Sequence, residues 1–401
     1  MLRECKSVYG VGEKSTPRVG VIGGGQLARM LFEASVPLEI DVRVLVRHES
    51  DAAATVARDV VVGDWQDLAT LVEFAESCAV VTFDHELVSP GVLQALEAAG
   101  VVLHPSASAM TLASDKATQR DLARAVGIRV ISHATAADRP ALRAAVSDIG
   151  FPAVVKATRG GYDGRAVWWV RGPSDLAALA DAYDFSDGLL LVEPALDISA
   201  ELATLVVRRG NGELVRYPVV RTEQSDGICV SVTAPAATTA ELARQAQDGA
   251  AALADVLGYV GVLAVEYFVV GGELFLNELA PRPHNSGHYT IDACVTSQFE
   301  NHLRAVLDWP LGDPSMITPA AVMANLIATS PRRIPLSDIK LPPGASAHLY
   351  GKTPSPDRKV GHVTVCGADR VVLRRTALEV AHQLTGPALE PVGPLGPAAA
   401  R

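Results

Sequence analysis

The first third of the chain alternates short apolar runs with stretches of helix-forming residues. The apolar runs are brief and rich in β-branched residues, which predicts strands at 18–22, 41–46, 60–62, 79–83 and 101–103. Helices are predicted between them at 26–34, 66–76 and 90–98. Strands that are apolar on both faces belong in a parallel sheet covered by helices, with ligands beyond the carboxyl ends of the strands. This region therefore predicts a Rossmann-like α/β domain.

A second unit begins with the helix predicted over 114–126. Ser114 is placed to cap this helix, Leu122, Ala125 and Val126 share one face, and Gly127 is placed to end it. Strands at 153–157, 167–170 and 189–193 and a helix near 174–183 follow. This α+β arrangement is too short to be a second Rossmann half.

The third region is richer in hairpins. Strands at 201–208 and 213–220 flank Gly210-Asn211-Gly212, a long helix is predicted over 238–257, and strands at 261–270 and 273–280 meet at Gly271-Gly272. No internal repeat of fixed period is visible in the sequence.

Length and composition restrict the class of protein. The chain has 401 residues, enough for roughly two or three domains, and 49% of them are hydrophobic. The net charge of −10 disfavours nucleic acid or an anionic membrane surface as the main partner. Five scattered cysteines suggest neither a disulfide framework nor a zinc site, so a reducing cytoplasm fits best. No run approaches the ~18 apolar residues of a membrane span, and no signal peptide is recognisable.

The glycines Gly23-Gly24-Gly25 follow a predicted strand and open a predicted helix, where backbone N–H groups can hold a phosphate. The dinucleotide fingerprint is incomplete because Ala28 stands where its last glycine is expected. A tight turn that lets strand and helix pack explains the glycines equally well.

A cationic glycine-rich loop follows the strand that ends in Lys156. Its sequence is Lys156-Ala157-Thr158-Arg159-Gly160-Gly161-Tyr162-Asp163-Gly164-Arg165. Glycines give a backbone the freedom to donate N–H groups to phosphate oxygens, and closure of such a loop expels water from a reactive intermediate. The alternative is a solvated hairpin turn, but a lysine at the end of an apolar strand is unusual as surface decoration.

Glu266 and Glu278 lie on the hairpin around Gly271-Gly272, and the register decides their meaning. A two-residue turn pairs Glu266 with Asn277 and turns Glu278 to the other face, whereas a three-residue loop sets the two glutamates opposite each other. Facing carboxylates repel among apolar neighbours, and Mg²⁺ removes that penalty. The alternative places both glutamates on solvent-facing positions.

Two polar segments complete the candidate chemistry. The first is Pro281-Arg282-Pro283-His284-Asn285-Ser286-Gly287-His288, in which a guanidinium beside imidazole and amide groups suits a small planar oxyanion. The second is basic and combines Tyr350-Gly351-Lys352 with Arg358-Lys359-Val360-Gly361-His362. Taken alone, it fits a solvated loop equally well.

In combination these motifs resemble the ATP-grasp superfamily, and within it the family of N5-carboxyaminoimidazole ribonucleotide synthetases of purine biosynthesis. The resemblance runs in order across nearly the whole chain and rests on residues 23–30, 160–165, 277–288 and 358–362. It implies an α/β ATP-grasp fold. The composition of the two ends predicts a disordered leader (1–17) and a disordered tail (387–401). Between them the resemblance implies a Rossmann-like substrate-binding domain (18–112) and small and large ATP-grasp subdomains (113–195 and 196–386, the second with the C-terminal basic segment).

The resemblance also implies a reaction and its ligands. In this family ATP phosphorylates bicarbonate to carboxyphosphate, and the amine of 5-aminoimidazole ribonucleotide captures the carboxy group. The implied cofactors are ATP and Mg²⁺, with Mn²⁺ as an alternative, and the implied state is a cytoplasmic homodimer without nucleic-acid or membrane partners. The ATP-binding residues would be Lys116, Lys156, Gly161, Tyr162, Asp163, Gly164, Arg165, Glu193, Ala195, Glu201, Gln224, Asn277 and Glu278. The magnesium ligands would be Glu266 and Glu278.

Other residues would serve bicarbonate and the ribonucleotide. The catalytic set implied by the resemblance is Arg282, His284, Asn285, Lys352 and Arg358. The substrate-binding set is Gly25, Gln26, Leu27, Tyr162, Asp163, Arg165 and Ser286. Two departures from the family pattern stand out: Ala166 replaces a glycine at the end of the loop, and Ser355 and Asp357 stand where a basic residue and a glycine are expected.

Three other functions compete with this interpretation. A Rossmann oxidoreductase explains the N-terminal glycines but neither the paired glutamates nor the cationic loop. A non-catalytic nucleotide-binding protein fits the departures, but Lys156, Glu266, Glu278 and Arg282 speak against it. Another ATP-grasp enzyme, with glycinamide ribonucleotide or biotin as acceptor, keeps the nucleotide site, and the segment 282–288 is the reason for preferring aminoimidazole ribonucleotide.

Overall fold

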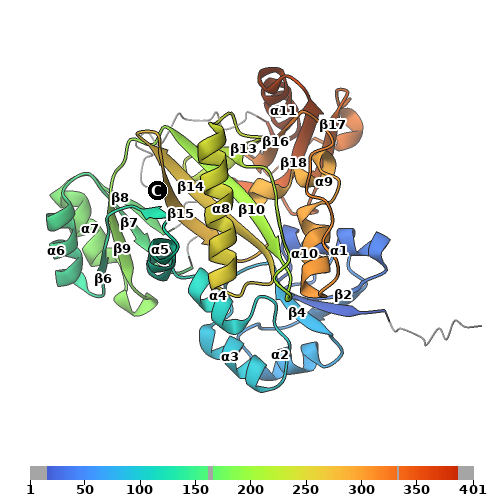
Figure 1. Ribbon diagram of the computed structural model, residues 1–401, viewed down its shortest axis with the longest axis horizontal. Helices are drawn as coiled ribbons and strands as arrows, with labels where there is room; N and C mark the ends of the chain where they lie inside the picture. Colours follow the sequence, from blue (N-terminus) through green and yellow to red (C-terminus); the bar gives the residue numbers. More distant parts are fainter. Residues whose placement is uncertain (1–15, 161–165, 332–333, 387–401) are drawn as a thin grey trace, which may run out of the picture.

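Three sheets organise the computed structural model, which describes residues 16–160, 166–331 and 334–386 (Figure 1). The strands are β1 (Arg18–Ile22), β2 (Asp41–Val46), β3 (Asp59–Val62), β4 (Val80–Phe83), β5 (Arg129–Val130), β6 (Ala134–Ala136), β7 (Ala153–Ala157), β8 (Val167–Val170), β9 (Leu190–Pro194), β10 (Ala200–Arg208), β11 (Leu214–Arg216), β12 (Val220–Ser225), β13 (Ile228–Ala234), β14 (Gly261–Val270), β15 (Glu273–Ala280), β16 (Ala320–Ala328), β17 (Ala345–Leu349) and β18 (Arg358–Gly367). The helices are α1 (Gln26–Ser35), α2 (Leu68–Ala75), α3 (Pro90–Ala98), α4 (Ala107–Ala113), α5 (Lys116–Ala125), α6 (Arg139–Ile149), α7 (Pro173–Ala182), α8 (Ala240–Val256), α9 (Thr290–Ala293), α10 (Gln298–Val306) and α11 (Arg370–Thr385).

The N-terminal sheet confirms the predicted parallel βαβ series. Its described strands pair in the order β3-β2-β1-β4, all parallel. The prediction of a strand at 101–103 is wrong, because only an isolated bridge joins Leu103 to Val81. Pro105 follows shortly afterwards and has no N–H to extend the pairing.

The small antiparallel sheet has the order β6-β9-β7-β8, with α6 and α7 on one side of it (Figure 1). The helix that precedes this sheet differs from its prediction. Asp115, not Ser114, caps α5 by accepting from the Thr118 N–H, while Ser114 ends the unpredicted α4 and donates to the Met110 carbonyl.

The buried face of α5 is also different from the one predicted. The helix buries Lys116, Gln119, Arg120 and Ala123, whereas Ala125 is exposed. Apolar periodicity therefore located the helix but not the side that faces inward. Three polar side chains on a buried helical face need partners within the protein or a ligand.

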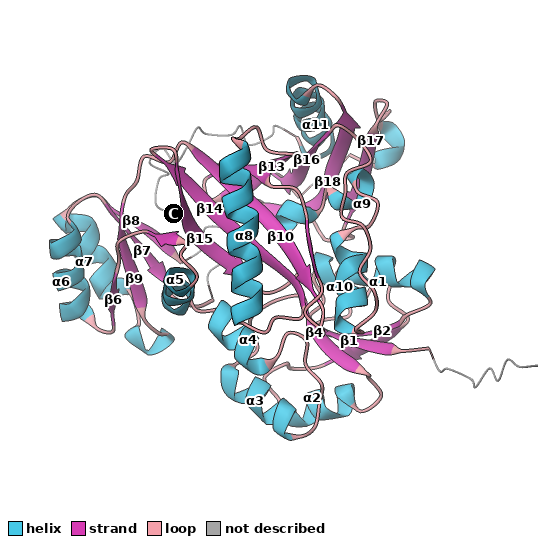
Figure 2. Cartoon of the chain, viewed as in Figure 1, coloured by secondary structure: helices cyan, strands magenta, loops and turns pink. Residues whose placement is uncertain are grey.

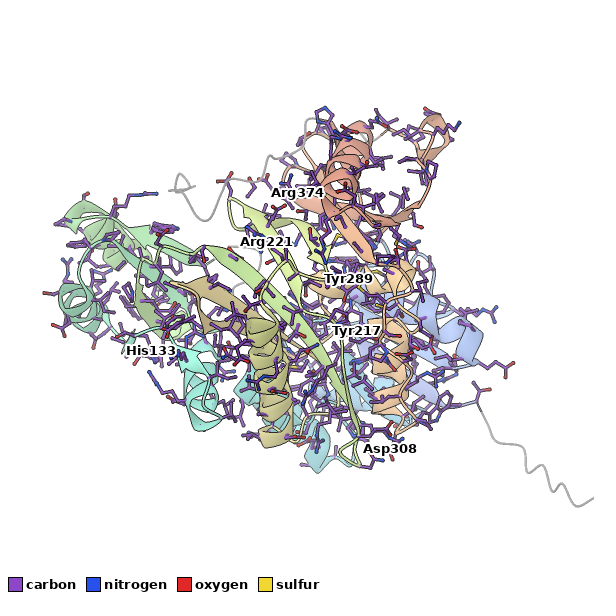
Figure 3. The ribbon with its side chains drawn as sticks, turned by 45° about the horizontal axis from the view of Figure 1, so that its top comes forward. His133, Tyr217, Arg221, Tyr289, Asp308 and Arg374 are labelled. Atoms are coloured by element: carbon purple, nitrogen blue, oxygen red, sulfur yellow. The ribbon has the colours of Figure 1, made fainter. Side chains whose placement is uncertain are left out.

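The large mixed sheet forms the body of the molecule, and its described strands run β17-β18-β16-β13-β12-β10-β14-β15-β5, with β11 beside β10. Helix α8 lies across one face of the central strands, as Figure 2 shows, and α10 packs on β14 and β10 and also contacts α1. The predicted strand 213–220 is interrupted at Tyr217, which is fully buried and donates its hydroxyl to the Thr296 carbonyl (Figure 3). Pro218 next to it cannot donate to a ladder.

The hairpin of β14 and β15 brings Glu266 opposite Glu278, as one of the two predicted registers requires, but by a different route. The turn is the two-residue one, because Val270 pairs with Glu273. A β-bulge between Glu266 and Tyr267 then leaves Asn277 without an opposite residue and restores the pairing of the glutamates. The predicted three-residue loop is therefore wrong, since one extra residue in a bulge shifts the register as a longer loop would.

Hydrogen bonds of the buried His302 join the N-terminal domain to the large sheet. The His302 ring accepts the Val262 N–H at Nδ1 and lies 2.8 Å from the Thr82 hydroxyl at Nε2. Burial lowers the pKa of His302 to about 3, so the ring is neutral and both nitrogens are used. The hydrogen bond between Thr82 and His302 holds the end of β4 against α10.

None of the described helices is long and apolar enough to cross a membrane.

Candidate active site

The two glutamates leave the sheet on the face opposite α8. Their neighbours Val265 and Leu279 turn into the core beneath α8, so Glu266 and Glu278 face the other way. Burial raises the pKa of Glu266 to about 8, and the charges of Glu278 and Glu201 act in the same direction. The Asn277 amide lies on this face too, 3.4 Å from a Glu266 oxygen. The facing carboxylates are hard oxygen donors that fit a divalent cation such as Mg²⁺, and the Asn277 NH₂ group donates to one of them.

Lysines project toward this group from the neighbouring domain. The Lys116 ammonium is 3.0 Å from a Glu278 oxygen, and the Lys156 ammonium is 2.9 Å from a Glu193 oxygen. Both lysines are more than nine-tenths buried. Both lysines were predicted to bind ATP, and the fold places each of them within ion-pair distance of a glutamate.

Glu193 is held by two cations. Arg120 donates from Nε and Nη2 to one oxygen of Glu193 at 3.0 and 2.8 Å, and Lys156 contacts the other oxygen. Although burial favours the neutral form, the charges of Lys156 and Arg120 bring the pKa of Glu193 down to about 2. Arg120 also donates to the carbonyl of Asn277, the bulge residue, at 2.7 Å. It thereby ties the small sheet to the hairpin that carries the glutamates.

The remaining predicted ATP residues lie at the edge of this group. Burial raises the pKa of Glu201 to about 7, against the effect of its hydrogen bond with Gln224 and of the Lys156 charge. The Ala195 N–H donates to the Pro152 carbonyl at 3.0 Å, so the Ala195 backbone is anchored to the small domain. Gly161, Tyr162, Asp163, Gly164 and Arg165 lie outside the described residues.

The segment after β15 carries Arg282, which forms an ion pair with Glu86. The distances are 2.7 Å from Nε and 3.2 Å from Nη2 to the two carboxylate oxygens, and both side chains are mostly buried. Burial opposes this charge, but Arg282 brings the pKa of Glu86 down to about 2. The carboxylate comes from the N-terminal domain, just after β4.

His284 and Asn285 are also held in place. His284 Nε2 lies 3.7 Å from a Glu266 oxygen, and its Nδ1 lies 2.9 Å from the Ser286 hydroxyl. Ser286 is buried and serves this contact. The Asn285 amide exchanges two hydrogen bonds with the buried Asn325, at 2.9 and 2.7 Å. The predicted oxyanion residues thus lie beside the carboxylate pair on a rigid segment.

At the glycine turn, a side chain of the protein itself occupies the helix N-terminus. The Asp84 carboxylate accepts the Gly25 N–H at 2.6 Å, and a Cβ on Gly23 would lie 1.6 Å from an Asp84 oxygen. Gly23 also has a φ of +120°. The packing interpretation of these glycines therefore accounts for Gly23 fully, and Asp84 stands where a phosphate would accept from Gly25.

Gln26 and Lys352 meet although 326 positions separate them in the sequence. The Lys352 ammonium donates to the Gln26 side-chain oxygen at 2.5 Å. The Leu27 side chain packs in the domain core, so only its backbone can meet a ligand. The Arg358 guanidinium is exposed and donates to the Thr353 carbonyl at 3.2 Å. The predicted ribonucleotide residues therefore include one joined pair, Gln26 and Lys352.

The fold adds residues to this site that no sequence motif indicated. Arg120 and Glu86 have no local motif, because each acquires its role from a partner distant in sequence. Lys359 is 8% exposed, and its positive charge favours the ionised form of Glu266. It lay within the quoted basic segment, and its position next to Val360 at the start of an apolar strand was the available signal.

Two of the family departures coincide with unusual backbone. Ala166 has a φ of +60° and Asp357 a φ of +63°, both in the left-handed region. Glycine adopts this region without cost, whereas other L-residues pay roughly 1 to 2 kcal/mol, least for asparagine and aspartate. This explains why a glycine is expected at both positions and why aspartate is the milder replacement.

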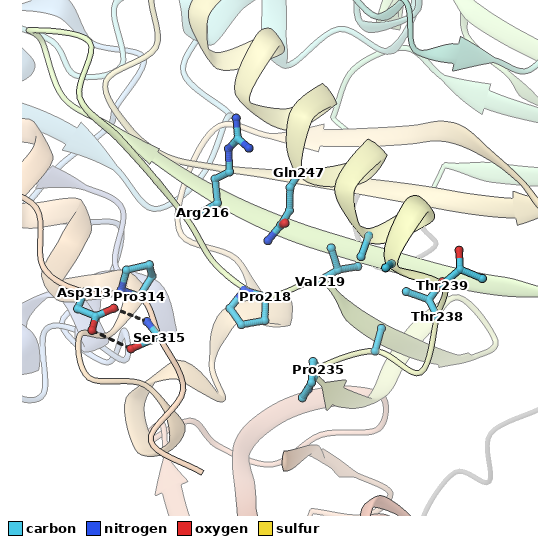
Figure 4. A pocket seen from close by; sticks show the side chains of 13 residues that line it. Arg216, Pro218, Val219, Pro235, Thr238, Thr239, Gln247, Asp313, Pro314 and Ser315 are labelled. Carbon is cyan, nitrogen blue, oxygen red and sulfur yellow. Dashed lines mark hydrogen bonds between the residues drawn. The ribbon is translucent and has the colours of Figure 1, made fainter. Parts of the chain in front are cut away.

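Two other features of the described residues lie apart from these side chains. Asp292, His348 and His362 bring possible ligand atoms within 4.8 Å of one another, but the two rings stack at 17° with centroids 4.6 Å apart. Stacked rings cannot both direct an in-plane lone pair at one metal ion. A hollow of about 440 Å³ lies near the start of α8, and its lining, which includes Arg216, Gln247 and Asp313, contains none of the predicted site residues (Figure 4).

Family models match three stretches of the chain. Residues 16–114 match the ribonucleotide synthetase preATP-grasp domain, residues 121–299 the ATP-grasp domain, and residues 321–376 the phosphoribosylaminoimidazole carboxylase C-terminal domain. The fold predicted by the resemblance, ATP-grasp with an N-terminal Rossmann-like domain, is confirmed.

Individual proteins match over nearly the whole chain. The chain is 45% identical to an N5-carboxyaminoimidazole ribonucleotide synthase of Mycobacterium bovis, over 92% of this chain and 88% of that protein. The crystal structure of the synthetase from Thermus thermophilus aligns with a TM-score of 0.82 at 35% identity, covering 92% and 99% of the two chains. The synthase of Aspergillus clavatus, solved with ADP and 5-aminoimidazole ribonucleotide, aligns with a TM-score of 0.81 at 30% identity, covering 92% and 99%.

Proposed function

Because the chain belongs to the family of N5-carboxyaminoimidazole ribonucleotide synthases and is an ATP-grasp ligase of purine biosynthesis, we propose that it carboxylates 5-aminoimidazole ribonucleotide with bicarbonate. ATP is converted to ADP and phosphate, and N5-carboxyaminoimidazole ribonucleotide is formed. The observation that carries this proposal is the carboxylate pair Glu266 and Glu278, set beside Lys116 and the anion-binding segment of Arg282.

Glu266 and Glu278 would hold Mg²⁺, with Asn277 beside them. When bound, the ion supplies charge neutralisation for the ATP phosphates. Lys116 and Lys156 would contact the phosphates, Glu201 and Gln224 the ribose, and the backbone near Glu193 and Ala195 the adenine. Residues 161–165 would cover the nucleotide. Their contribution is positioning and charge neutralisation, because phosphoryl transfer needs little covalent help from the protein.

Bicarbonate becomes reactive when it gains a phosphate leaving group. An oxygen of bicarbonate forms a bond to the γ-phosphorus of ATP while the bond from that phosphorus to the bridging oxygen breaks, which releases ADP. Arg282, His284 and Asn285 would hold bicarbonate and then carboxyphosphate. Oriented donors aimed at a developing oxyanion stabilise it without reorganising during the reaction.

The acceptor would approach from the N-terminal domain. Its amine forms a C–N bond to the carboxy carbon while the C–O bond to phosphate breaks, and the departing phosphate takes up the proton that the amine loses. Gly25, Gln26, Leu27 and Ser286 would line this side, Lys352 and Arg358 would bind the ribonucleotide phosphate, and Tyr162, Asp163 and Arg165 would approach the aminoimidazole. The Lys352–Gln26 contact supports this, since it brings a cation to the carboxyl edge of the parallel sheet.

We further propose a homodimer in the cytoplasm, Mn²⁺ as a substitute for Mg²⁺, and domain boundaries after residues 17, 112, 195 and 386. Size-exclusion chromatography with light scattering tests the dimer. A mass of one chain, 42.1 kDa, would contradict it.

Release of ADP tests the reaction. We expect ADP release to require Mg²⁺, ATP and bicarbonate. Formation of N5-carboxyaminoimidazole ribonucleotide should require 5-aminoimidazole ribonucleotide as well. Each component is omitted in turn from bicarbonate-depleted buffer. Turnover with glycinamide ribonucleotide or biotin as acceptor, or a requirement for NAD, would contradict the proposal.

Arg282→Ala tests the assignment of the oxyanion residue. We expect kcat/KM for bicarbonate to fall by about 10² to 10³, the usual cost of removing one oxyanion donor, with a much smaller change in the KM for ATP. Initial rates with each substrate varied measure both values. An equal loss for ATP and bicarbonate would argue against this role.

A further inference from the structure

Glu86 is the carboxylate that faces Arg282, and it belongs to a different domain. Glu86 follows β4 in the segment matched by the preATP-grasp model, whereas Arg282 follows β15 in the segment matched by the ATP-grasp model. The two side chains are 17% and 16% exposed. A mostly buried ion pair is costly to desolvate, so it stabilises poorly compared with apolar packing. Its presence next to a proposed substrate site calls for another explanation.

The geometry of the pair determines which edge of the guanidinium is occupied. Glu86 accepts from Nε and from one N–H of Nη2, and the Pro283 carbonyl accepts from one N–H of Nη1 at 3.3 Å. A guanidinium has five N–H donors. Against the described residues three are used, and the other two lie one on each terminal nitrogen. A planar oxyanion with two acceptor oxygens can receive both.

Without Glu86 the guanidinium has other acidic neighbours. The charges of Asp84 and Glu278 act on Arg282 in the same sense as that of Glu86, so both lie near it. An arginine that turned to Glu278 would occupy a proposed magnesium ligand and present a different edge to the anion. Glu86 therefore decides between competing orientations of one side chain.

We propose that Glu86 is a positioning residue for bicarbonate and carboxyphosphate, because its carboxylate holds the Nε edge of Arg282 and directs the terminal nitrogens to the anion. This inference rests on the proposed function of Arg282 and adds a residue to it. Since Glu86 is carried by the domain proposed to bind the acceptor, it also links the orientation of the oxyanion residue to the docking of that domain.

The test compares Glu86→Gln with Glu86→Asp. A glutamine can accept from Nε but places an NH₂ group against Nη2, so one of the two bonds is lost. We expect the KM for bicarbonate to rise by about 10 to 100-fold in Glu86→Gln, the scale expected when a substrate-positioning group is misplaced by about 1 Å. The KM for ATP should change less than about twofold. Glu86→Asp, which keeps the charge, should recover part of the loss.

Thr82→Val is the matched control for domain docking. It removes the hydrogen bond between Thr82 and His302, which joins the same two domains without touching Arg282. Circular dichroism and thermal unfolding are measured for every variant. We expect Thr82→Val to lower the unfolding temperature without a selective change in the KM for bicarbonate.

Several outcomes would overturn the inference. Equal losses for all three substrates that match those of Thr82→Val would indicate a purely structural role for Glu86. A raised KM for 5-aminoimidazole ribonucleotide alone would indicate direct contact with the acceptor. An unchanged KM for bicarbonate in Glu86→Gln would exclude the positioning role. Failure of the proposed function is distinguished by the unmodified protein, which would then release no ADP in a bicarbonate-dependent manner.

Discussion

Glu193 and Glu266 are both carboxylates set among apolar strands, but their surroundings differ in charge. Glu193 faces Lys156 and Arg120, which bring its pKa down to about 2. Glu266 faces Glu278, and burial together with this like charge brings its pKa up to about 8. Arg120 links the two places, because it also donates to the Asn277 carbonyl on the strand of Glu278.

This difference in surrounding charge distinguishes Glu193, which holds other side chains of the site in place, from Glu266, which would bind a ligand. Around Glu193 the chain supplies both charges, so the ion pairs are complete and orient Lys156 and Arg120. Around Glu266, burial and the carboxylates Glu278 and Glu201 favour the neutral form of the side chain, and a bound cation would favour the ionised form. Stability and function should therefore respond in opposite ways to substitution at the two places.

Glu278→Ala should have the largest effect. We expect Mg²⁺-dependent turnover to fall by about 10³-fold or more, since a metal ion contributes several kcal/mol to the transition state, while the fold remains intact. ADP release and circular dichroism measure the two properties. Glu273→Ala, on the same strand but exposed, is the control and should keep full turnover. Retained turnover in Glu278→Ala would contradict the cation-binding role assigned to Glu266 and Glu278.

Glu193→Gln should act on stability. It leaves two buried cations incompletely paired, so we expect the free energy of unfolding to fall by about 3 to 5 kcal/mol. Glu273→Gln breaks the exposed pair with Arg129 and should cost less than about 1 kcal/mol. Urea unfolding of both variants provides the comparison. Equal, small losses would mean that Glu193 is no more structural than a surface group.

Protonation of Glu193 should lower the free energy of unfolding at acidic pH. Its pKa in the folded protein is below the ordinary value of 4.5, so its contribution is complete above pH 4.5 and is lost as the pH falls toward about 2. The shift corresponds to about 3 kcal/mol. Unfolding free energies of the unmodified protein and Glu193→Gln, measured between pH 5.5 and 3, should converge. A constant difference across this range would contradict the assigned ion pairs.

Glu266→Gln should have the smallest effect on stability, and in the opposite direction. Because the pKa of Glu266 is raised to about 8 in the folded protein, its ionisation at neutral pH favours the unfolded chain, and glutamine removes this effect, so we expect the ligand-free protein to gain stability at pH 7. Turnover should nevertheless be lost. Thermal unfolding at low salt, with and without Mg²⁺ and ATP, measures this, and a destabilised variant would show that Glu266 is already balanced within the chain.

Much of the fold followed from local patterns. The bounds of β1, β2, β7, β8, β14, β15 and α3 match their predictions, because apolar alternation, β-branched residues and glycine turns act over a few neighbouring positions. The inward face of α5 could not be predicted in this way. Its buried residues Lys116, Gln119 and Arg120 are polar, and a hydrophobic pattern assigns such residues to the surface.

The candidate site, like the fold, could be predicted from the sequence only in part. The sequence showed which chemical groups stand near one another along the chain, such as Glu266 with Glu278 and Arg282 with His284. Their partners Glu86 and Arg120 lie 196 positions from Arg282 and 73 positions from Glu193, and no local signal identifies them. Only the packing of one domain against another selects such pairs.

Most strands and helices, and the residue types that bind anions and cations, follow from local periodicity and side-chain chemistry. The tertiary structure alone decided that a bulge at Asn277 turns Glu278 to the same face as Glu266. It also decided that Asp84, rather than a ligand, meets the Gly25 amide. Register and long-range contacts depend on how whole surfaces compete for burial, and no short stretch of sequence contains that information.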